Sequence, residues 1–272
     1  MKIFVINLKR STTRRAFMKQ QLDAQQLDYE FVKAVDGAVL TEEYLAQVCN
    51  FEELGKYPHQ LRRGVYGCQL SHYNVYQKIV ADDLPYALIM EDDVTVDPSF
   101  SVVLAELALQ IKPKEIILLF SQNNYMPTVL STVNAVILPE NHLLTYPITV
   151  WAFGSAAGYI IGRDAAQSMA DSVLPMCFAA DAWPHFYHKD AISSLRLVTP
   201  FLVKPAGFKS DIDYVNGSSL LGKALAFIDK HEIHPFKQIL TYRRRKALNK
   251  TIGYSFTDDP SPIPTRLSDL TS

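Results

Sequence analysis

The feature that most constrains the fold is the alternation, over the first 120 residues, of short apolar runs with segments of helical periodicity. Runs rich in Val, Ile and Phe are typical of strands buried on both faces of a parallel sheet. The runs predicted to be strands cover residues 2–7, 29–35, 86–90 and 115–120. The helices predicted between them cover residues 11–25, 41–48, 67–79 and 97–110. This alternation predicts an α/β fold with a mainly parallel central sheet flanked by helices.

The rest of the chain is less regular. Residues 51–66 are expected to form a polar loop, and residues 121–150 show no clear period. Further regular structure is predicted as a strand at 156–162, a helix at 163–173 and an interrupted strand at 195–205. We expect one main domain and two smaller C-terminal parts. The expected boundaries are 1–215 for the main domain, 216–257 for a helical C-terminal extension and 258–272 for a proline-containing, disordered tail.

Charge and cysteine usage exclude several classes of protein. Lys and Arg number 27 against 28 Asp and Glu, so the chain has no general attraction to nucleic acid or to anionic membranes. The three cysteines lack CxxC spacing, which favours reduced thiols over a disulfide framework. The N-terminal apolar run is too short for a signal peptide, and no apolar run reaches the length of a membrane span. We therefore expect a cytoplasmic protein.

Three adjacent acids follow one of the most apolar strands. Glu91, Asp92 and Asp93 come directly after residues 86–90. Carboxylates at the end of a buried strand repel one another and lose hydration, so they need a compensating positive charge. A divalent cation such as Mg²⁺ or Mn²⁺ is the usual compensation, and ligands of open α/β sheets bind at the carboxyl ends of strands. The alternative is a turn in which the acids cap the backbone or pair with arginines; the arginines considered are Arg62, Arg63 and Arg163.

Four ordered blocks resemble glycosyltransferase family 25. They are VINLKRSTTRR at 5–15, FVKAVDG at 31–37, YGCQLSHYNVYQKI at 66–79 and ALIMEDDVTV at 87–96. A weaker block, GSAAGYIIGRDAA at 154–166, extends the resemblance, which becomes thin beyond about residue 190. The family includes bacterial lipooligosaccharide galactosyltransferases and animal collagen galactosyltransferases.

The resemblance implies a GT-A-like fold, a UDP-sugar donor and a Mn²⁺ or Mg²⁺ ion held by a DxD-type motif. Here that motif reads EDD. It implies Asp93 as the principal metal ligand, Glu91 as a supporting one, and Asp92 as a contact to hydroxyls of the ribose or the donor sugar. The metal would bind the diphosphate and lower the cost of releasing UDP.

Other residues of the matching blocks are candidates for donor binding. Asn7 and Leu8 end the first strand, where they could contact the uracil edge, and Arg14 or Arg15 could face the base or the diphosphate. A solvated helix face is the alternative for the arginines. Asp36 is a candidate for the ribose or an ordinary turn residue.

His72 lies on the same helical stripe as Cys68, so a core histidine competes with a donor-site role.

An inverting transfer also needs a base for the acceptor hydroxyl. FAADAWPHF at 178–186 supplies Asp181, which resembles the family's second acidic motif, and Trp183, whose ring could pack on a sugar. The alternative is an N-cap aspartate with a core tryptophan. His185 and His188 are weaker candidates for the base, and their spacing could also indicate metal ligation.

The densest basic run is a candidate for peripheral contact with anionic lipid. It consists of Arg243, Arg244, Arg245 and Lys246. A solvated helix face is the alternative, and nucleic-acid binding is disfavoured because the run is isolated.

The resemblance implies metal-dependent transfer of a hexose, galactose before glucose, from a UDP-sugar to a lipooligosaccharide or lipopolysaccharide acceptor, and we expect inversion. Because such an acceptor is linked to lipid, we expect the reaction to take place at the inner face of the cytoplasmic membrane. A metal-dependent phosphohydrolase and a non-catalytic protein that binds nucleotide sugars or glycans are the alternatives.

Overall fold

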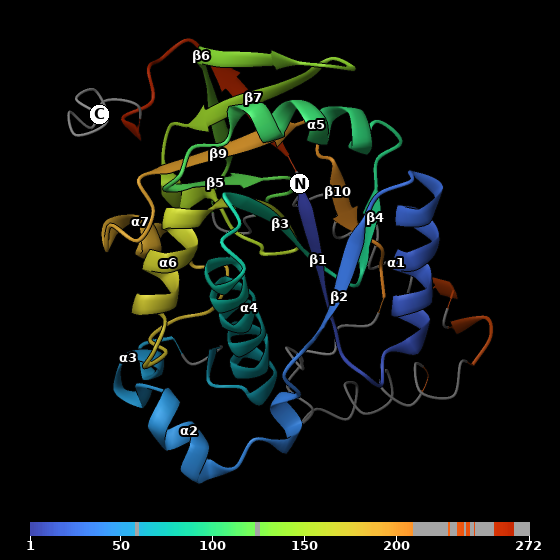
Figure 1. Cartoon of the computed structure of the whole chain (residues 1–272), viewed down its shortest axis with the longest axis vertical. Coiled ribbons are helices and arrows are strands. Elements are labelled where there is room, and N and C mark those ends of the chain that lie inside the picture. Colours follow the sequence, from blue (N-terminus) through green and yellow to red (C-terminus); the bar gives the residue numbers. More distant parts are fainter. Residues whose placement is uncertain are drawn as a thin grey trace.

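A computed structural model describes residues 1–57, 60–122, 126–208 and 253–263, with positions 228, 233–236, 238–239 and 242. Its centre is a nine-stranded sheet in the order β11-β6-β7-β9-β5-β8-β3-β1-β2 (Figure 1). The strands of this sheet are β1 (Lys2–Asn7), β2 (Tyr29–Lys33), β3 (Tyr86–Glu91), β5 (Glu115–Leu118), β6 (Thr128–Leu138), β7 (His142–Pro147), β8 (Gly158–Gly162), β9 (Ser194–Thr199) and β11 (Tyr254–Thr257). A small antiparallel sheet consists of β4 (Val94–Val96) and β10 (Val203–Pro205).

Most strands of the large sheet point the same way. Parallel pairs join β1 to β2 and to β3, β5 to β9, and β6 to β11. Among the described strands, only β7 and β8 run against the rest, because both pair antiparallel with their neighbours. The predicted α/β class with a mainly parallel sheet is confirmed.

Helices cover the sheet. They are α1 (Thr12–Ala24), α2 (Glu42–Val48), α3 (Phe51–Gly55), α4 (Arg63–Ala81), α5 (Phe100–Gln110), α6 (Arg163–Ser172) and α7 (Trp183–His188), with short 3₁₀ turns η1 (Gly37–Val39) and η3 (Val150–Ala152). Figure 1 shows α4 and α6 side by side, where they pack against the middle strands, and α1 beside β4. The core consists mainly of fully buried strand residues such as Phe4, Ile89 and Ile160 together with inward residues of these helices.

The loop predicted at 51–66 is shorter in the structure, because helices α3 and α4 occupy its two ends. Asn50 accepts a hydrogen bond from the backbone N–H of Glu53 at 3.1 Å and so caps α3. Helix α4 begins at Arg63, four residues before the predicted start, and Val65 and Tyr66 in its first turn are already buried.

The segment without a clear period contains the hairpin β6–β7, whose register shifts between Ser131 and Val136. The predicted strand at 195–205 is two strands. Proline at 200 has no N–H to donate, so β9 ends before it, and β10 pairs with β4 instead.

The C-terminal predictions need correction where the structure describes them. Tyr254–Thr257, expected within a helical extension, form β11 parallel to β6. Residues 258–263 are ordered and not disordered, since Ser261 and Ile263 are buried and the Ser261 hydroxyl donates to the carbonyl of Pro147. The basic run at 243–246 lies outside the described residues, and the domain boundaries stay a prediction. Within the described part of the chain, no helix has the length and apolar character needed to span a membrane.

Candidate active site

A pocket of about 1130 Å³ opens where the carboxyl ends of β1, β2 and β3 meet. Because these strands are parallel, their ends lie at one edge of the sheet. Strand β8 is antiparallel to β3, so the segment that leads into it, residues 155–157, reaches the same edge. The first turn of α4, residue Asp181 and the segment after β10 complete the wall.

The acids after β3 are held by groups from β1 and α1. Asp92 is buried and accepts a hydrogen bond from Asn7 Nδ2 at 2.6 Å. Arg14 Nη1 lies 3.0 Å from Asp92 Oδ1 and 3.2 Å from Asp93 Oδ2, so one guanidinium contacts both carboxylates. Burial raises the pKa of Asp92, and the hydrogen bonds from Asn7 and Arg14 act in the opposite direction. Arginine pairing of the triplet therefore occurs through Arg14. Arg63 pairs with Glu42, and Arg163 pairs with Asp83.

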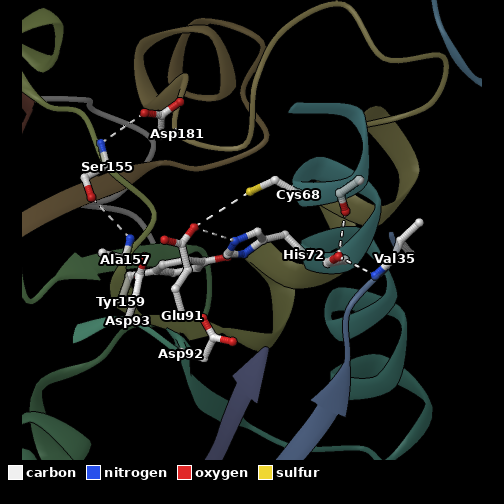
Figure 2. Close-up of polar contacts among 12 residues, drawn as sticks. Val35, Cys68, His72, Glu91, Asp92, Asp93, Ser155, Ala157, Tyr159 and Asp181 are labelled. Atoms are coloured by element: carbon white, nitrogen blue, oxygen red, sulfur yellow. Dashed lines mark hydrogen bonds and ion pairs between the residues drawn. The ribbon is translucent and has the colours of Figure 1, made fainter. Parts of the chain in front are cut away.

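Glu91 contacts a different set of side chains. Its Oε1 lies 3.7 Å from Cys68 Sγ and 3.7 Å from His72 Nε2, and both come from α4 (Figure 2). His72 is fully buried, and its Nδ1 lies 2.8 Å from the hydroxyl of Tyr159. The Tyr159 hydroxyl is 2.7 Å from that of Tyr76. His72 is thus both a core residue and a pocket residue, which joins the two alternatives raised by its position in the sequence.

Asp181 lies across the pocket and accepts a hydrogen bond from the backbone N–H of Ser155 at 3.2 Å (Figure 2). Its side chain is open to the pocket but enclosed elsewhere by protein, and this desolvation raises its pKa, with the charge of Glu91 acting in the same direction. Ser155 has a φ of 76°, an unusual conformation for a residue other than glycine. The raised pKa and the pocket position suit a proton acceptor.

Trp183 does not have the predicted sugar-stacking position. It is fully buried, its ring centroid lies 4.9 Å from that of Tyr159, and its Nε1 donates to the carbonyl of Ser155 at 3.0 Å. Trp183 therefore helps to fix the position of Ser155, and the backbone N–H of Ser155 in turn binds the carboxylate of Asp181. The core-tryptophan alternative is correct.

His185 and His188 lie in an aromatic cluster and do not line the pocket. His185 stacks on Phe178 with ring centroids 4.9 Å apart, and His188 lies 5.4 Å from Trp151. Burial lowers the pKa of His185. Within the described residues, the two histidines are not part of any group of three metal-ligating side chains.

The candidate nucleotide residues divide into two groups. Leu8 and Asp36 line the pocket, and Asp36 pairs with Arg10 while accepting from the backbone N–H of Ala38 at 3.1 Å. Asn7 is turned toward Asp92 and does not line the pocket. Arg15 is exposed and packs over the ring of Phe31 at 4.0 Å, outside the pocket.

Close packing of two glycines places the Asp36 turn against α4. A Cβ on Gly67 would lie 2.7 Å from the carbonyl oxygen of Val35, and one on Gly37 would collide with the backbone of Arg63. The Ser71 hydroxyl adds a link, since it accepts from the N–H of Val35 at 2.8 Å. These contacts bring the first turn of α4 and the end of β2 to the same wall.

Sequence reasoning missed three residues of the site: Cys68, Ser155 and Tyr159. The sequence analysis gives Cys68 no role at the site, although its spacing of four from His72 puts both on one helix face. Tyr159 carries the polar group of an otherwise apolar strand, which was a signal for a hydrogen-bonded partner. The conformation of Ser155 has no signal in the sequence.

The acids after β3 differ in how well they suit a metal ion. Asp93 offers oxygen donors, which Mg²⁺ and Mn²⁺ prefer, and its side chain is 28% exposed at the pocket. Glu91 and Asp93 do not share a group of three ligands; in the described residues the one such group is Cys68, His72 and Glu91. A hard cation fits Asp93 if the donor's phosphates supply the remaining ligands, and Glu91 fits less well because its carboxylate lies against Cys68 and His72.

Comparisons with known proteins point in one direction. A protein of Acanthamoeba polyphaga mimivirus, named as a candidate glycosyltransferase, is 33% identical over 177 residues, which cover 63% of this chain and 52% of that protein. Human procollagen galactosyltransferase 2 is 39% identical over 110 residues, which cover 39% of this chain and 17% of that protein. The chain thus spans about half of one relative and about a sixth of the other.

A solved glycosyltransferase involved in glycosylation of the major capsid of PBCV-1 aligns with 72% of this chain and 91% of its own, at 9% identity and a TM-score of 0.32. The model of glycosyltransferase family 25, described as an LPS biosynthesis protein, matches residues 1–183. This chain therefore belongs to glycosyltransferase family 25.

Proposed function

We propose that the chain transfers a hexose, with galactose the first choice, from a UDP-sugar to a hydroxyl group of a glycan acceptor. The observation that carries the proposal is one pocket with Asp93 and Arg14 on one side and Asp181 on the other. Family membership supports a sugar transfer, and the name of the human relative supports galactose. The family description supports a lipopolysaccharide-type acceptor.

The donor is expected to lie along the ends of β1 and β2. Leu8 and Asp36 line the pocket there, next to the first turn of α4 and Arg63. Helix N-termini and arginines attract phosphate groups, so this wall suits a nucleoside diphosphate. Arg14 positions the carboxylate of Asp93 and lies at the same wall.

Asp93 is the residue that would hold Mn²⁺ or Mg²⁺, whose chemistry is to bind the diphosphate and reduce the charge that develops on UDP as it leaves. Arg14 contacts both Asp92 and Asp93 and so reduces the repulsion between the two carboxylates. Asp92 lines the pocket, and its contacts with Asn7 and Arg14 orient the turn, so its role as a contact to donor hydroxyls stays a proposal.

Asp181 is the proposed base. The acceptor oxygen attacks the anomeric carbon, its proton passes to Asp181, and the bond from that carbon to the diphosphate oxygen breaks. Direct displacement of this kind inverts the anomeric configuration. Ser155 and Trp183 keep Asp181 at the pocket wall.

A donor screen tests the proposal. The protein is incubated with Mn²⁺ and either UDP-galactose, UDP-glucose or their N-acetyl forms, and UDP release is measured with and without sugar acceptors. We expect acceptor-dependent UDP release that is fastest with UDP-galactose. Phosphoester hydrolysis without an acceptor would support the phosphohydrolase alternative, and UDP-sugar binding without turnover would support a non-catalytic binding protein.

A further inference from the structure

Three side chains of the pocket form a compact group with mixed ligand chemistry. Cys68 offers a sulfur, His72 an imidazole nitrogen and Glu91 a carboxylate oxygen, and these atoms lie within 4.8 Å of one another. Two of the separations are 3.7 Å, from Glu91 Oε1 to Cys68 Sγ and to His72 Nε2. Ligands of a tetrahedral zinc ion, at bond lengths of about 2.0–2.3 Å, lie about 3.4–3.6 Å apart. Small side-chain movements therefore bring the three atoms around one ion.

His72 provides an independent observation that something binds here. Its side chain is fully buried, and its Nε2 has no hydrogen-bond partner. The nearest carboxylate oxygen, Glu91 Oε1, is 3.7 Å away, which is too far for a hydrogen bond. Buried polar atoms are nearly always satisfied, so an orphaned Nε2 aimed at a thiol and a carboxylate indicates a missing partner.

The other side of the imidazole is arranged as for a metal ligand. Nδ1 lies 2.8 Å from the Tyr159 hydroxyl, which continues to Tyr76. Ligating histidines usually donate their second ring N–H to such a partner, which fixes the ring and leaves the lone pair of the other nitrogen for the ion. The helical spacing of Cys68 and His72 puts both on one face of α4, and Glu91 meets them from the end of β3.

We propose that Cys68, His72 and Glu91 form a binding site for Zn²⁺, separate from the Mn²⁺ or Mg²⁺ expected at Asp93. Sulfur and imidazole donors select zinc over the hard cations that oxygen-only sites prefer. On binding, the Cys68 thiol loses its proton to solvent as the zinc–sulfur bond forms. Three protein ligands would leave a fourth position open, and all three line the same pocket as Asp181.

Zinc binds the thiolate form of cysteine, so zinc affinity should rise with pH, with proton release on binding. In the proposed transfer the divalent cation is assigned to Asp93 and the base to Asp181, so failure of the zinc site and failure of the transfer reaction can be told apart.

The test is zinc binding to the full-length chain after removal of metals. A chromophoric chelator competes with the protein for Zn²⁺, and we expect one tightly bound Zn²⁺ per chain. Cys68→Ala should weaken binding by at least about 100-fold, because it removes a direct ligand and loss of an outer partner alone costs about 10- to 100-fold. Cys177→Ala is the matched control and should bind zinc as the wild type does, because Cys177 lies outside the pocket.

Co²⁺ as a spectroscopic substitute gives a readout that is independent of activity. The wild-type chain and Cys177→Ala should show a sulfur-to-cobalt charge-transfer band, and Cys68→Ala should lack it. Absence of stoichiometric zinc binding, unchanged affinity in Cys68→Ala, or bound Co²⁺ without a thiolate band would overturn the proposal. If Cys68→Ala fails to fold, Glu91→Gln decides: weaker zinc binding supports the site, and wild-type affinity refutes it.

Discussion

Asp93 is the residue on which the proposed metal dependence rests. Its carboxylate is partly exposed at the pocket and is contacted by Arg14. Asp93→Asn keeps the shape of the side chain and an acceptor for Arg14 but removes the charge that a divalent cation needs. We expect loss of transfer, together with loss of the Mn²⁺-dependent rise in Tm that UDP gives the wild type by binding only the native state. Turnover at the wild-type rate, or wild-type activity in excess chelator, would refute the metal role.

Asp181 allows a test by pH. Burial raises its folded-state pKa, so between the usual aspartate pKa of about 3.9 and that higher value the folded protein binds more protons than the unfolded one. The contribution of Asp181 to stability is therefore lost as pH rises through this window, and Asp181→Asn should lose less stability over the same range. The measurement is the free energy of urea unfolding of both proteins at a series of pH values. If this free energy changes with pH in the same way for both proteins, the raised pKa assigned to Asp181 is wrong.

The same substitution should affect the reaction without affecting donor binding. A positioned base contributes roughly 100-fold or more, so Asp181→Asn should lower transfer by at least that factor. The affinity for UDP should stay close to that of the wild type. Loss of both would assign Asp181 to donor binding or to structure.

At the scale of single residues, the sequence predicted that the acids follow a buried strand, but it did not predict which side chains contact them. The EDD turn follows a strand that is buried on both faces, which is a local pattern. The choice of Arg14 over Arg15 depends on the rotation of α1, and the signal was present: Arg14, Met18 and Leu22 are spaced by four, and the last two are fully buried. The contact from Cys68 to Glu91 joins residues from two elements and needs the fold.

Among the elements, the packing of α4 on the turn after β2 shapes one wall of the pocket. Gly67→Ala would place a Cβ 2.7 Å from the Val35 carbonyl oxygen and from the Gly37 nitrogen. Because both contacts are to backbone, we expect a loss of about 1–3 kcal/mol in the free energy of unfolding. Urea unfolding measures it.

Gly55→Ala is the matched control, since its Cβ would meet nothing within 4 Å. Alanine suits a helix better than glycine, so the control should be neutral or up to about 1 kcal/mol more stable. Equal effects of the two substitutions would show that the close approach at Gly67 does not exist.

The strands that are continuous apolar runs were predicted from the sequence, whereas β6, whose exposure is mixed, was not. Strands β1 and β3 are continuous apolar runs, whereas β6 has many exposed positions and a register shift. The turn of the β6–β7 hairpin has positive φ at both Glu140 and Asn141, 54° and 59°, without the Asn-Gly pair that usually marks such a turn. The antiparallel direction of β8 comes from tertiary pairing, which no local pattern reports.

At the scale of the whole molecule, a buried ion pair links two neighbouring strands in the middle of the large sheet. Glu115 on β5 and Arg196 on β9 lie 2.7 Å apart with side chains 0% and 4% exposed, where the strands near the pocket meet those of the C-terminal half. The match to the family model ends at residue 183, before β9 begins, yet the sheet continues through this pair. Strand β9, which lies beyond the match, is therefore part of the same sheet.

Arg196→Met should cost about 3–5 kcal/mol in the free energy of unfolding, because it leaves Glu115 buried without a counter-charge. Adding Glu115→Met should recover part of the loss. Lys114→Met, which breaks the exposed pair with Asp190, is the control and should change stability by less than about 1 kcal/mol. Denaturant unfolding of the four proteins measures these differences, and a small effect of Arg196→Met would contradict the role given to the pair.

The central claim is transfer of a hexose from a UDP-sugar with inversion at the anomeric carbon. NMR of the product formed from UDP-galactose, Mn²⁺ and a sugar acceptor tests it most directly, because one spectrum reports both the new glycosidic bond and its configuration. UDP-galactose is an α-linked donor, so the account predicts a β-linked galactosyl product. An α-linked product would contradict direct displacement with Asp181 as base, and free galactose with an unmodified acceptor would contradict the transfer itself.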